Sequence, residues 1–375
     1  MKTNIKKLIS LILAAVMTLS CLALTSCGDS SATALKLGDF KITEAMYSYW
    51  ASSYKGSYMY SYSDIKNTDE YWNSEIEEGV TVAEYFDDLT LDAVKAIRVN
   101  EKLFDENRLS FTEKEEQAID DYISDLIVER AEGSKNMMNT LLGEYGINLK
   151  ILKRIYLAEE KASKVYNCLF GEGGEMEVDD EEYDTFYKEN YVRFQLIYIN
   201  NAYKYTTDDE GNRITDEDGY YVTEDLSKKE KEKKDAKVKA VVDGLGAGGD
   251  FDELYDEYSE LKSYKNGYYY SAAESYSDAL YYRLVAEAQK LKVGEWTSVE
   301  SDTGTCIIKK MELDEKPWEN KENDDFFGEG GESFKDLVSE TAYREFIESY
   351  FDDIKVDEDI IKKYSVKNVT PAYFF

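Results

Sequence analysis

The sequence predicts an α+β protein in which a mostly helical part is followed by a part that contains β-strands. Residues from about 44 to 170 carry apolar side chains at helical spacing, and two capping boxes, at 81–84 and 112–115, mark helix starts. Residues 192–199 (VRFQLIYI) instead form an apolar run of strand length. A Gly-rich stretch at 171–175 separates the two patterns. The 375 residues are therefore expected to form two domains, with room for a further piece.

The first half opens with a predicted hairpin. Residues 34–43 (ALKLGDFKIT) alternate around Gly38 and Asp39, and helical spacing starts near Glu44. A further amphipathic stretch covers about 149–169.

The second half opens with a short helix over 178–191, with Asp179 as its N-cap, that leads into the strand at 192–199. Residues 200–225 contain two acidic Gly turns and predict a surface hairpin. A solvated helix is expected over 227–243, and a shorter helix follows near Phe251.

Residues 316–332 contain Pro317 and a Gly-Glu-Gly-Gly stretch, so they predict a linker. A helix is expected after them, because apolar side chains recur at helical spacing. Its apolar stripe consists of Phe334, Leu337, Val338, Tyr343, Phe346, Ile347 and Phe351.

The first residues have the pattern of a targeting segment, with three lysines before an apolar run. The motif Leu24-Thr25-Ser26-Cys27 resembles the lipobox of bacterial lipoproteins. That resemblance implies cleavage of residues 1–26, a lipid on Cys27 and a tether over 27–33. A plain secretory signal is the alternative, and a transmembrane helix is disfavoured because the run is short.

The composition is strongly acidic, with a formal net charge of −33, and this excludes nucleic acid as an expected partner because phosphate contacts need clustered Lys and Arg. No cofactor is predicted, since the sequence contains no phosphate loop, zinc spacing or nucleophile motif. The acidic turns at 208–211 and 216–219 leave a calcium loop open as a weaker alternative to a plain hairpin. Cys168 and Cys306 are expected to be two buried thiols.

Three segments, 192–199, 250–259 (DFDELYDEYS) and 291–310, resemble in order and spacing the first strand, second helix and last two strands of a parvulin-type peptidyl-prolyl isomerase domain. The resemblance implies a four-stranded antiparallel sheet with helices over 177–315, including a hairpin insertion at about 200–225. It also implies a helical chaperone-like domain over 34–176. Residues 316–375 would then supply the linker and a C-terminal helix that packs on the N-terminal domain.

The chain contains no histidine, although the family site is built around two. The resemblance places the family histidines at Leu196 and Cys306, and the family acid or cysteine near Leu261, with Glu260 one residue earlier. Leu196 and Cys306 facing each other would make an apolar contact between strands. A Cys306–Glu260 pair is a less favoured polar substitute. No catalytic residue is assigned.

The apolar proline cup of the family fits this sequence better. Its aromatic position falls on Leu284, and Tyr281 lies one turn earlier. Tyr268 and Tyr270 share one face of a strand and are further candidates for substrate binding. Tyrosine, of which the chain has 33, suits contact with varied peptides, but it can equally be the ordinary aromatic residue of the core.

The expected function is that of a membrane-anchored foldase or chaperone outside the cytoplasm, held by its N-terminal lipid to the outer face of a bacterial cell membrane. Its partners would be unfolded or proline-containing polypeptides, and its isomerase activity weak or absent. The alternatives are an active isomerase with a site that lacks histidine, and a binding or adhesion lipoprotein that is not a chaperone. The sequence predicts neither client proteins nor an oligomeric state.

Overall fold

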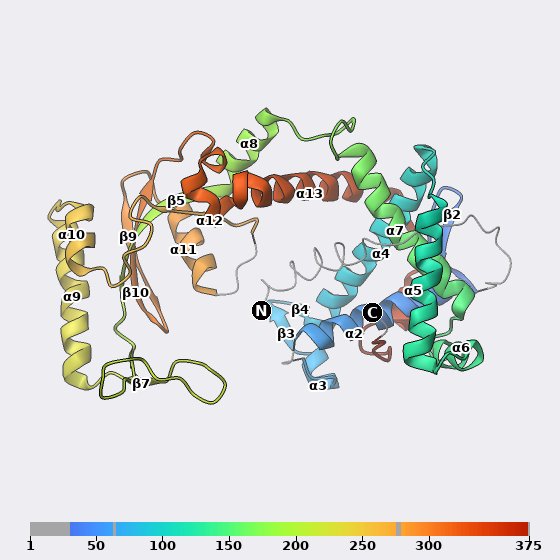
Figure 1. The fold of residues 1–375 in the computed structure, drawn as a ribbon, viewed down its shortest axis with the longest axis horizontal. Coiled ribbons are helices and arrows are strands. Elements are labelled where there is room, and N and C mark those ends of the chain that lie inside the picture. The colour runs from blue at the N-terminus through green and yellow to red at the C-terminus, as the bar shows by residue number, and fades with distance from the viewer. Residues whose placement is uncertain (1–30, 63–64, 275–278, 374–375) are drawn as a thin grey trace. The chain divides into compact units, whose positions relative to one another are not determined.

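The computed structural model describes residues 31–62, 65–274 and 279–373, so the targeting segment and Cys27 lie outside the described residues. The chain divides into two compact units (Figure 1). Of the described residues, 179–274 and 279–338 form the sheet unit, and 31–62, 65–178 and 339–373 form the helical unit. In the part of the chain that is described, no helix has the length and apolar character needed to span a membrane.

The helical unit begins with the expected hairpin and helix. The capping boxes predicted at Thr81 and Thr112 are confirmed, because each threonine accepts a hydrogen bond from the backbone N–H three residues later and each Glu bonds back. Its first elements are β1 (Thr33–Leu37), β2 (Phe40–Thr43), α2 (Glu44–Ser61), α3 (Asp69–Trp72), β3 (Glu75–Glu77), β4 (Val80–Thr81), α4 (Val82–Glu106), α5 (Glu113–Ala131), α6 (Lys135–Gly143) and α7 (Leu149–Leu169).

The C-terminal segment returns to the helical unit. β11 (Lys355–Val356) pairs antiparallel with β1, which gives a three-stranded sheet in the order β11-β1-β2. Tyr343 of α13 (Glu332–Glu348) donates a hydrogen bond to Asn100 Oδ1 at 2.6 Å. The remaining elements here are the 3-10 turn Phe351–Asp353 and α14 (Glu358–Lys363).

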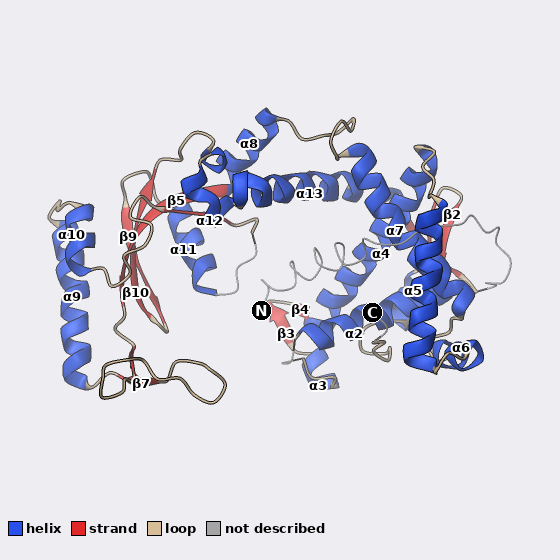
Figure 2. Ribbon diagram, viewed as in Figure 1, coloured by secondary structure: helices blue, strands red, loops and turns tan. Residues whose placement is uncertain are grey.

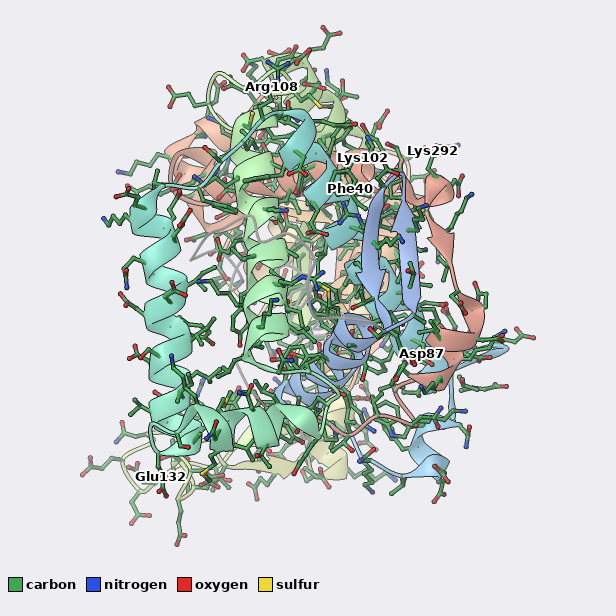
Figure 3. The ribbon with its side chains drawn as sticks, turned by 90° about the vertical axis from the view of Figure 1, so that its right-hand side faces the viewer. Phe40, Asp87, Lys102, Arg108, Glu132 and Lys292 are labelled. Atoms are coloured by element: carbon green, nitrogen blue, oxygen red, sulfur yellow. The ribbon has the colours of Figure 1, made fainter. Side chains whose placement is uncertain are left out.

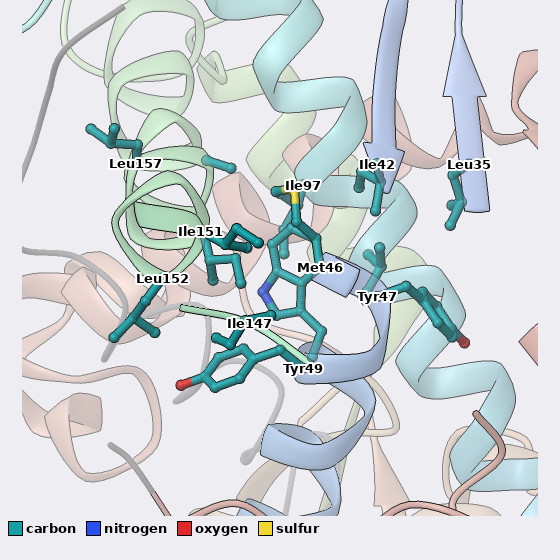
Figure 4. Close-up of a cluster of buried hydrophobic side chains, with 14 of the residues drawn as sticks. Leu35, Ile42, Met46, Tyr47, Tyr49, Ile97, Ile147, Ile151, Leu152 and Leu157 are labelled. Carbon is teal, nitrogen blue, oxygen red and sulfur yellow. The ribbon is translucent and has the colours of Figure 1, made fainter. Parts of the chain in front are cut away.

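The core of the helical unit gathers side chains from the hairpin, from α2, α4, α5, α6 and α7, and from the C-terminal segment (Figure 4). Met46 of α2, Ile97 of α4 and Ile151 of α7 belong to this one buried cluster. Leu35 and Ile42 add the inner face of the hairpin. The amphipathic stripes of the sequence therefore meet in one core.

The sheet unit contains a four-stranded antiparallel sheet in the order β8-β5-β10-β9 (Figure 2), which confirms the α+β class and the predicted sheet. Helix α11 packs on one face, and α9 and α10 pack on the other. The elements are α8 (Asp180–Asn190), β5 (Tyr191–Ile199), β6 (Tyr203–Tyr205), β7 (Thr223–Asp225), α9 (Lys228–Gly246), α10 (Phe251–Tyr258), β8 (Tyr268–Ser271), α11 (Ala279–Lys290), β9 (Trp296–Ser301) and β10 (Gly304–Met311).

The segment 316–332 is not a free linker, and that expectation is wrong. Its short turns, with α12 (Asp324–Phe327) among them, belong to the sheet unit. Trp318 is only 3% exposed and stacks on Phe334, with ring centroids 4.5 Å apart, while Phe327 is 1% exposed. Proline and glycine gave the segment the composition of a linker, but its large aromatic side chains are buried in the core of the sheet unit. The 3-10 turns are Pro317–Glu319, Lys321–Asn323 and Glu329–Gly331.

The insertion after β5 forms the expected hairpin, since β6 pairs antiparallel with β7. Its two acidic turns lie eight residues apart and close in the same way. Asp208 accepts backbone N–H bonds from Glu210 and Asn212, and Asp216 does the same for Asp218 and Tyr220. These carboxylates stabilise their own turns, and no group of three or more acidic or cysteine side chains within the described ranges is placed to hold a metal ion.

The two thiols differ in environment. Cys306 is buried in β10, whereas Cys168 is exposed near the end of α7, so the expectation of two buried thiols is wrong for Cys168. Leu169 and Phe170 fill the neighbouring core positions instead.

Candidate functional site

The site predicted from the sequence lies on the face of the sheet that α11 covers. Side chains alternate along a strand, so Leu196 of β5 and Cys306 of β10 point to this face, while their neighbours Ile197 and Ile307 point to α9 and α10. We call the cluster the α11 face. Its buried members are Val192, Phe194, Leu196, Tyr268, Leu284, Val285, Ala288, Val299, Cys306 and Ile308, and its partly buried members include Tyr198, Tyr270, Tyr281 and Phe326.

Leu196 and Cys306 share this face but are not directly opposite each other. The register pairs Leu196 with Ile308 and Cys306 with Tyr198, so the two positions are diagonal neighbours on antiparallel strands. The two side chains were expected to face each other directly, but the strand pairing offsets them by two residues. Both side chains are buried, at 7% and 1% exposure, and belong to the apolar packing of the sheet.

Glu260 lies away from the α11 face. Its carboxylate accepts hydrogen bonds from Lys234 Nζ at 2.6 Å and from Lys237 Nζ at 3.2 Å, both from α9. Desolvation raises the pKa of Glu260, but the two ammonium groups outweigh it and hold the pKa below its usual value. Because Cys306 lies on the other face, this geometry disfavours a Cys306–Glu260 pair. Leu261 is 39% exposed and is not a member of the α11 face.

The four predicted substrate-binding residues do come together. Tyr268 and Tyr270 stack with centroids 6.0 Å apart, and Tyr270 lies 5.0 Å from Tyr281 of α11. Leu284 is only 1% exposed, so it supports the face from below and does not offer surface to a ligand. Of the four, Tyr270 and Tyr281 are half-buried and keep part of their rings accessible.

The polar groups of this face are tyrosine hydroxyls. Burial raises the pKa of Tyr268 to about 12 and raises the pKa of Tyr270 further. These hydroxyls stay protonated at neutral pH, so they can donate hydrogen bonds but cannot serve as general bases. Tyr198 likewise donates to the carbonyl of Thr303 at 2.5 Å.

Sequence reasoning missed Phe326 and Tyr198. Phe326 of α12 contacts Tyr264 and, in β8, Tyr268, with centroid distances of 4.8 Å and 6.1 Å. Tyr264 fixes this helix by donating to Asp325 Oδ2 at 2.6 Å. The period of two from Leu196 could have identified Tyr198, but the linker-like composition around Phe326 gave no such signal.

No family model matches the chain, and no curated protein matches it. Its similarities are to solved structures. The foldase protein PrsA from Streptococcus pneumoniae str. Canada MDR_19A is 17% identical, over 79% of this chain and 100% of that one, with a TM-score of 0.24. PrsA from Bacillus subtilis is 18% identical, over 79% and 92% of the two chains, with a TM-score of 0.22.

A third similar structure, the peptidylprolyl isomerase PrsA from Bacillus cereus, is 16% identical over 78% of this chain and 97% of that one, with a TM-score of 0.28. Such TM-scores mean that the whole chains superpose poorly. The assignment of this chain as an α+β protein therefore rests on its own helices and its own four-stranded sheet.

Proposed function

We propose that this chain is a foldase or chaperone of the parvulin-domain lipoprotein type, which binds unfolded or proline-containing polypeptides and has weak or no isomerase activity. The observation that supports this most is the α11 face, where apolar and tyrosine side chains gather together with Leu196 and Cys306, the two positions to which the resemblance assigns the family histidines. The lipobox-like motif ending at Cys27 supports lipid anchoring outside the cytoplasm.

The chemistry of the face explains why binding is favoured over catalysis. Rotation about a prolyl peptide bond has a barrier of about 18–20 kcal/mol, which falls when the amide loses resonance. An apolar surface can hold the proline ring and favours the less polar twisted amide, and polar groups directed at the amide lower the barrier further. Here the two strand positions are filled by buried Leu196 and Cys306, and the rings of Tyr270 and Tyr281 offer mainly apolar area.

The proposal predicts chaperone activity without matching turnover. We expect the full chain at stoichiometric concentration to suppress light scattering by reduced, denatured lysozyme as it is diluted from denaturant. At catalytic concentration it should raise the isomerisation rate of a succinyl-Ala-Phe-Pro-Phe anilide by less than twofold. The Cys306→Ala variant should behave like the parent in both assays.

Rapid turnover that disappears in Cys306→Ala would contradict the proposal and establish an active isomerase with a thiol in its site. Failure in both assays, together with tight binding of one defined ligand, would instead favour a binding lipoprotein.

A further inference from the structure

The last described part of the chain lies along α2 of the helical unit. We call residues 364–373 the tail. Lys55 Nζ donates to the carbonyl of Val369 at 2.8 Å, and the N–H of Ala372 donates to the carbonyl of Ser52 at 2.8 Å. These two bonds use main-chain atoms of the tail, whereas Tyr364 and Tyr373 reach Glu44 and Met59 of α2 through their hydroxyl groups.

Asp87 and Tyr145, which lie outside α2, also bind main-chain atoms of the tail. The N–H of Val366 donates to Asp87 Oδ1 at 2.6 Å, and Asp87 is labelled in Figure 3. Tyr145 Oη donates to the carbonyl of Pro371 at 3.4 Å. Backbone atoms of four tail residues are thus bound without any requirement for a particular side chain.

Gly56 explains how the tail comes so close to the helix. A Cβ at this position would lie 1.9 Å from the carbonyl oxygen of Ala372, so only glycine leaves room for the chain. Glycine inside a helix costs about 1 kcal/mol relative to alanine. Its presence in the interior of α2 is consistent with a requirement for close approach of the backbone at Ala372.

Lys55 is unusual for a lysine, because it is only 1% exposed and its recorded hydrogen bond goes to a carbonyl group. Burial lowers its pKa, and the nearby Asp87 carboxylate opposes that shift. A buried ammonium needs a hydrogen-bond acceptor, and the carbonyl of Val369 supplies one, while the Trp72 ring centroid lies 5.4 Å from Nζ. That requirement is met by any polypeptide backbone in the same place.

We propose that Ser52, Lys55, Gly56, Asp87 and Tyr145 form a track that binds a short segment of an unfolded polypeptide, and that the tail occupies it until such a segment displaces it. This inference rests on the proposed function and adds a second binding site in the helical unit. The side chains of Val369 and Ala372 are buried, at 8% and 0% exposure. The preferred segment therefore carries an apolar residue followed, three positions later, by a small one.

Hydrogen–deuterium exchange on the full chain tests the displacement. Reduced, carboxymethylated α-lactalbumin serves as the unfolded polypeptide. At a saturating concentration, we expect amide exchange in peptides from residues 364–373 to accelerate at least tenfold, while peptides from α5 stay unchanged. Unchanged tail protection would overturn the proposal.

Two glycine-to-alanine variants separate the track from a general effect on folding. Gly56→Ala places a Cβ against the tail, so the tail should exchange at least tenfold faster without any added polypeptide, and α-lactalbumin should have no further effect. Gly143→Ala of α6 adds a Cβ with nothing within 4 Å and should behave like the parent. Thermal melting followed by circular dichroism checks that both variants fold.

The track proposal and the proposed chaperone function can be contradicted by different results. If Gly56→Ala releases the tail but α-lactalbumin never displaces it in the parent, the tail is only a structural strap and the track proposal is wrong. Suppression of lysozyme aggregation by that same parent chain would leave the proposed function intact.

Discussion

Replacing Phe327 by alanine is expected to lower the free energy of unfolding of the sheet unit by about 3–5 kcal/mol, the usual cost of removing a buried aromatic ring. The ring is 1% exposed and lies between Tyr191 and Tyr269, with centroids at 5.5 and 5.3 Å. It is supplied by the segment whose composition resembles a linker. A cost of this size would show that residues 316–332 are part of the folded core.

The neighbouring residue provides the control. Phe326 belongs to the same four-residue helix but is only partly buried, so Phe326→Ala should cost less than half as much. Urea denaturation followed by tyrosine and tryptophan fluorescence would compare the two variants with the parent. Equal and small effects for both would mean that the segment does not stabilise the sheet unit.

Glu159→Gln is expected to stabilise the helical unit by about 2 kcal/mol at pH 8 and to have little effect at pH 4.5. Burial raises the pKa of Glu159 to about 7, while the Trp50 indole N–H, which donates to its carboxylate at 2.6 Å, opposes the shift. The folded state therefore holds a proton that the unfolded state has released between about pH 4.5 and 7. Stability must fall as the pH rises through that range.

The glutamine variant keeps an acceptor for Trp50 and removes the ionisation. Tyr49, Tyr54, Tyr122 and Tyr156 surround the group, and none of them titrates in this range because burial raises the pKa of each one. Urea unfolding from pH 4.5 to 8, followed by tryptophan fluorescence, should show the parent losing stability and the variant staying level. Glu129→Gln, at an exposed position of α5, should follow the parent. Parallel pH profiles for Glu159→Gln and the parent would refute the argument.

Local patterns predicted much of the fold. Thr81, Thr112 and Asp179 begin helices at the expected residues because a capping side chain and its partner lie within four positions of each other. The four-stranded sheet was predicted because segments of this sequence resemble, in order and spacing, the strands of a parvulin-type domain. The linker prediction for 316–332 failed because it concerned contacts between residues far apart in the sequence. Trp318 and Phe327 are buried by residues from elsewhere in the sheet unit, and composition alone does not reveal this.

The candidate site was predictable to the same degree. The resemblance assigned Leu196 and Cys306 to facing positions on two strands, but the register that offsets them is set by pairing across more than 100 residues. The low expectation for a Cys306–Glu260 pair agrees with the structure, but the sequence did not indicate that Lys234 and Lys237 of α9 bind Glu260. The tail could not be predicted at all, since its bonds to Lys55 and Ser52 span more than 300 residues.

Peptide binding at the α11 face without isomerase activity can be tested by methyl-resolved NMR of the full chain with a succinyl-Ala-Phe-Pro-Phe peptide, because one sample reports both the place of binding and the rate of isomerisation. We expect shifts in the methyl groups of Leu196, Leu284 and Val285 on the α11 face, with prolyl exchange close to the rate of the free peptide. Shifts confined to Ile197, Ile307 and Val241 on the opposite face, or exchange accelerated as by an enzyme, would contradict this expectation.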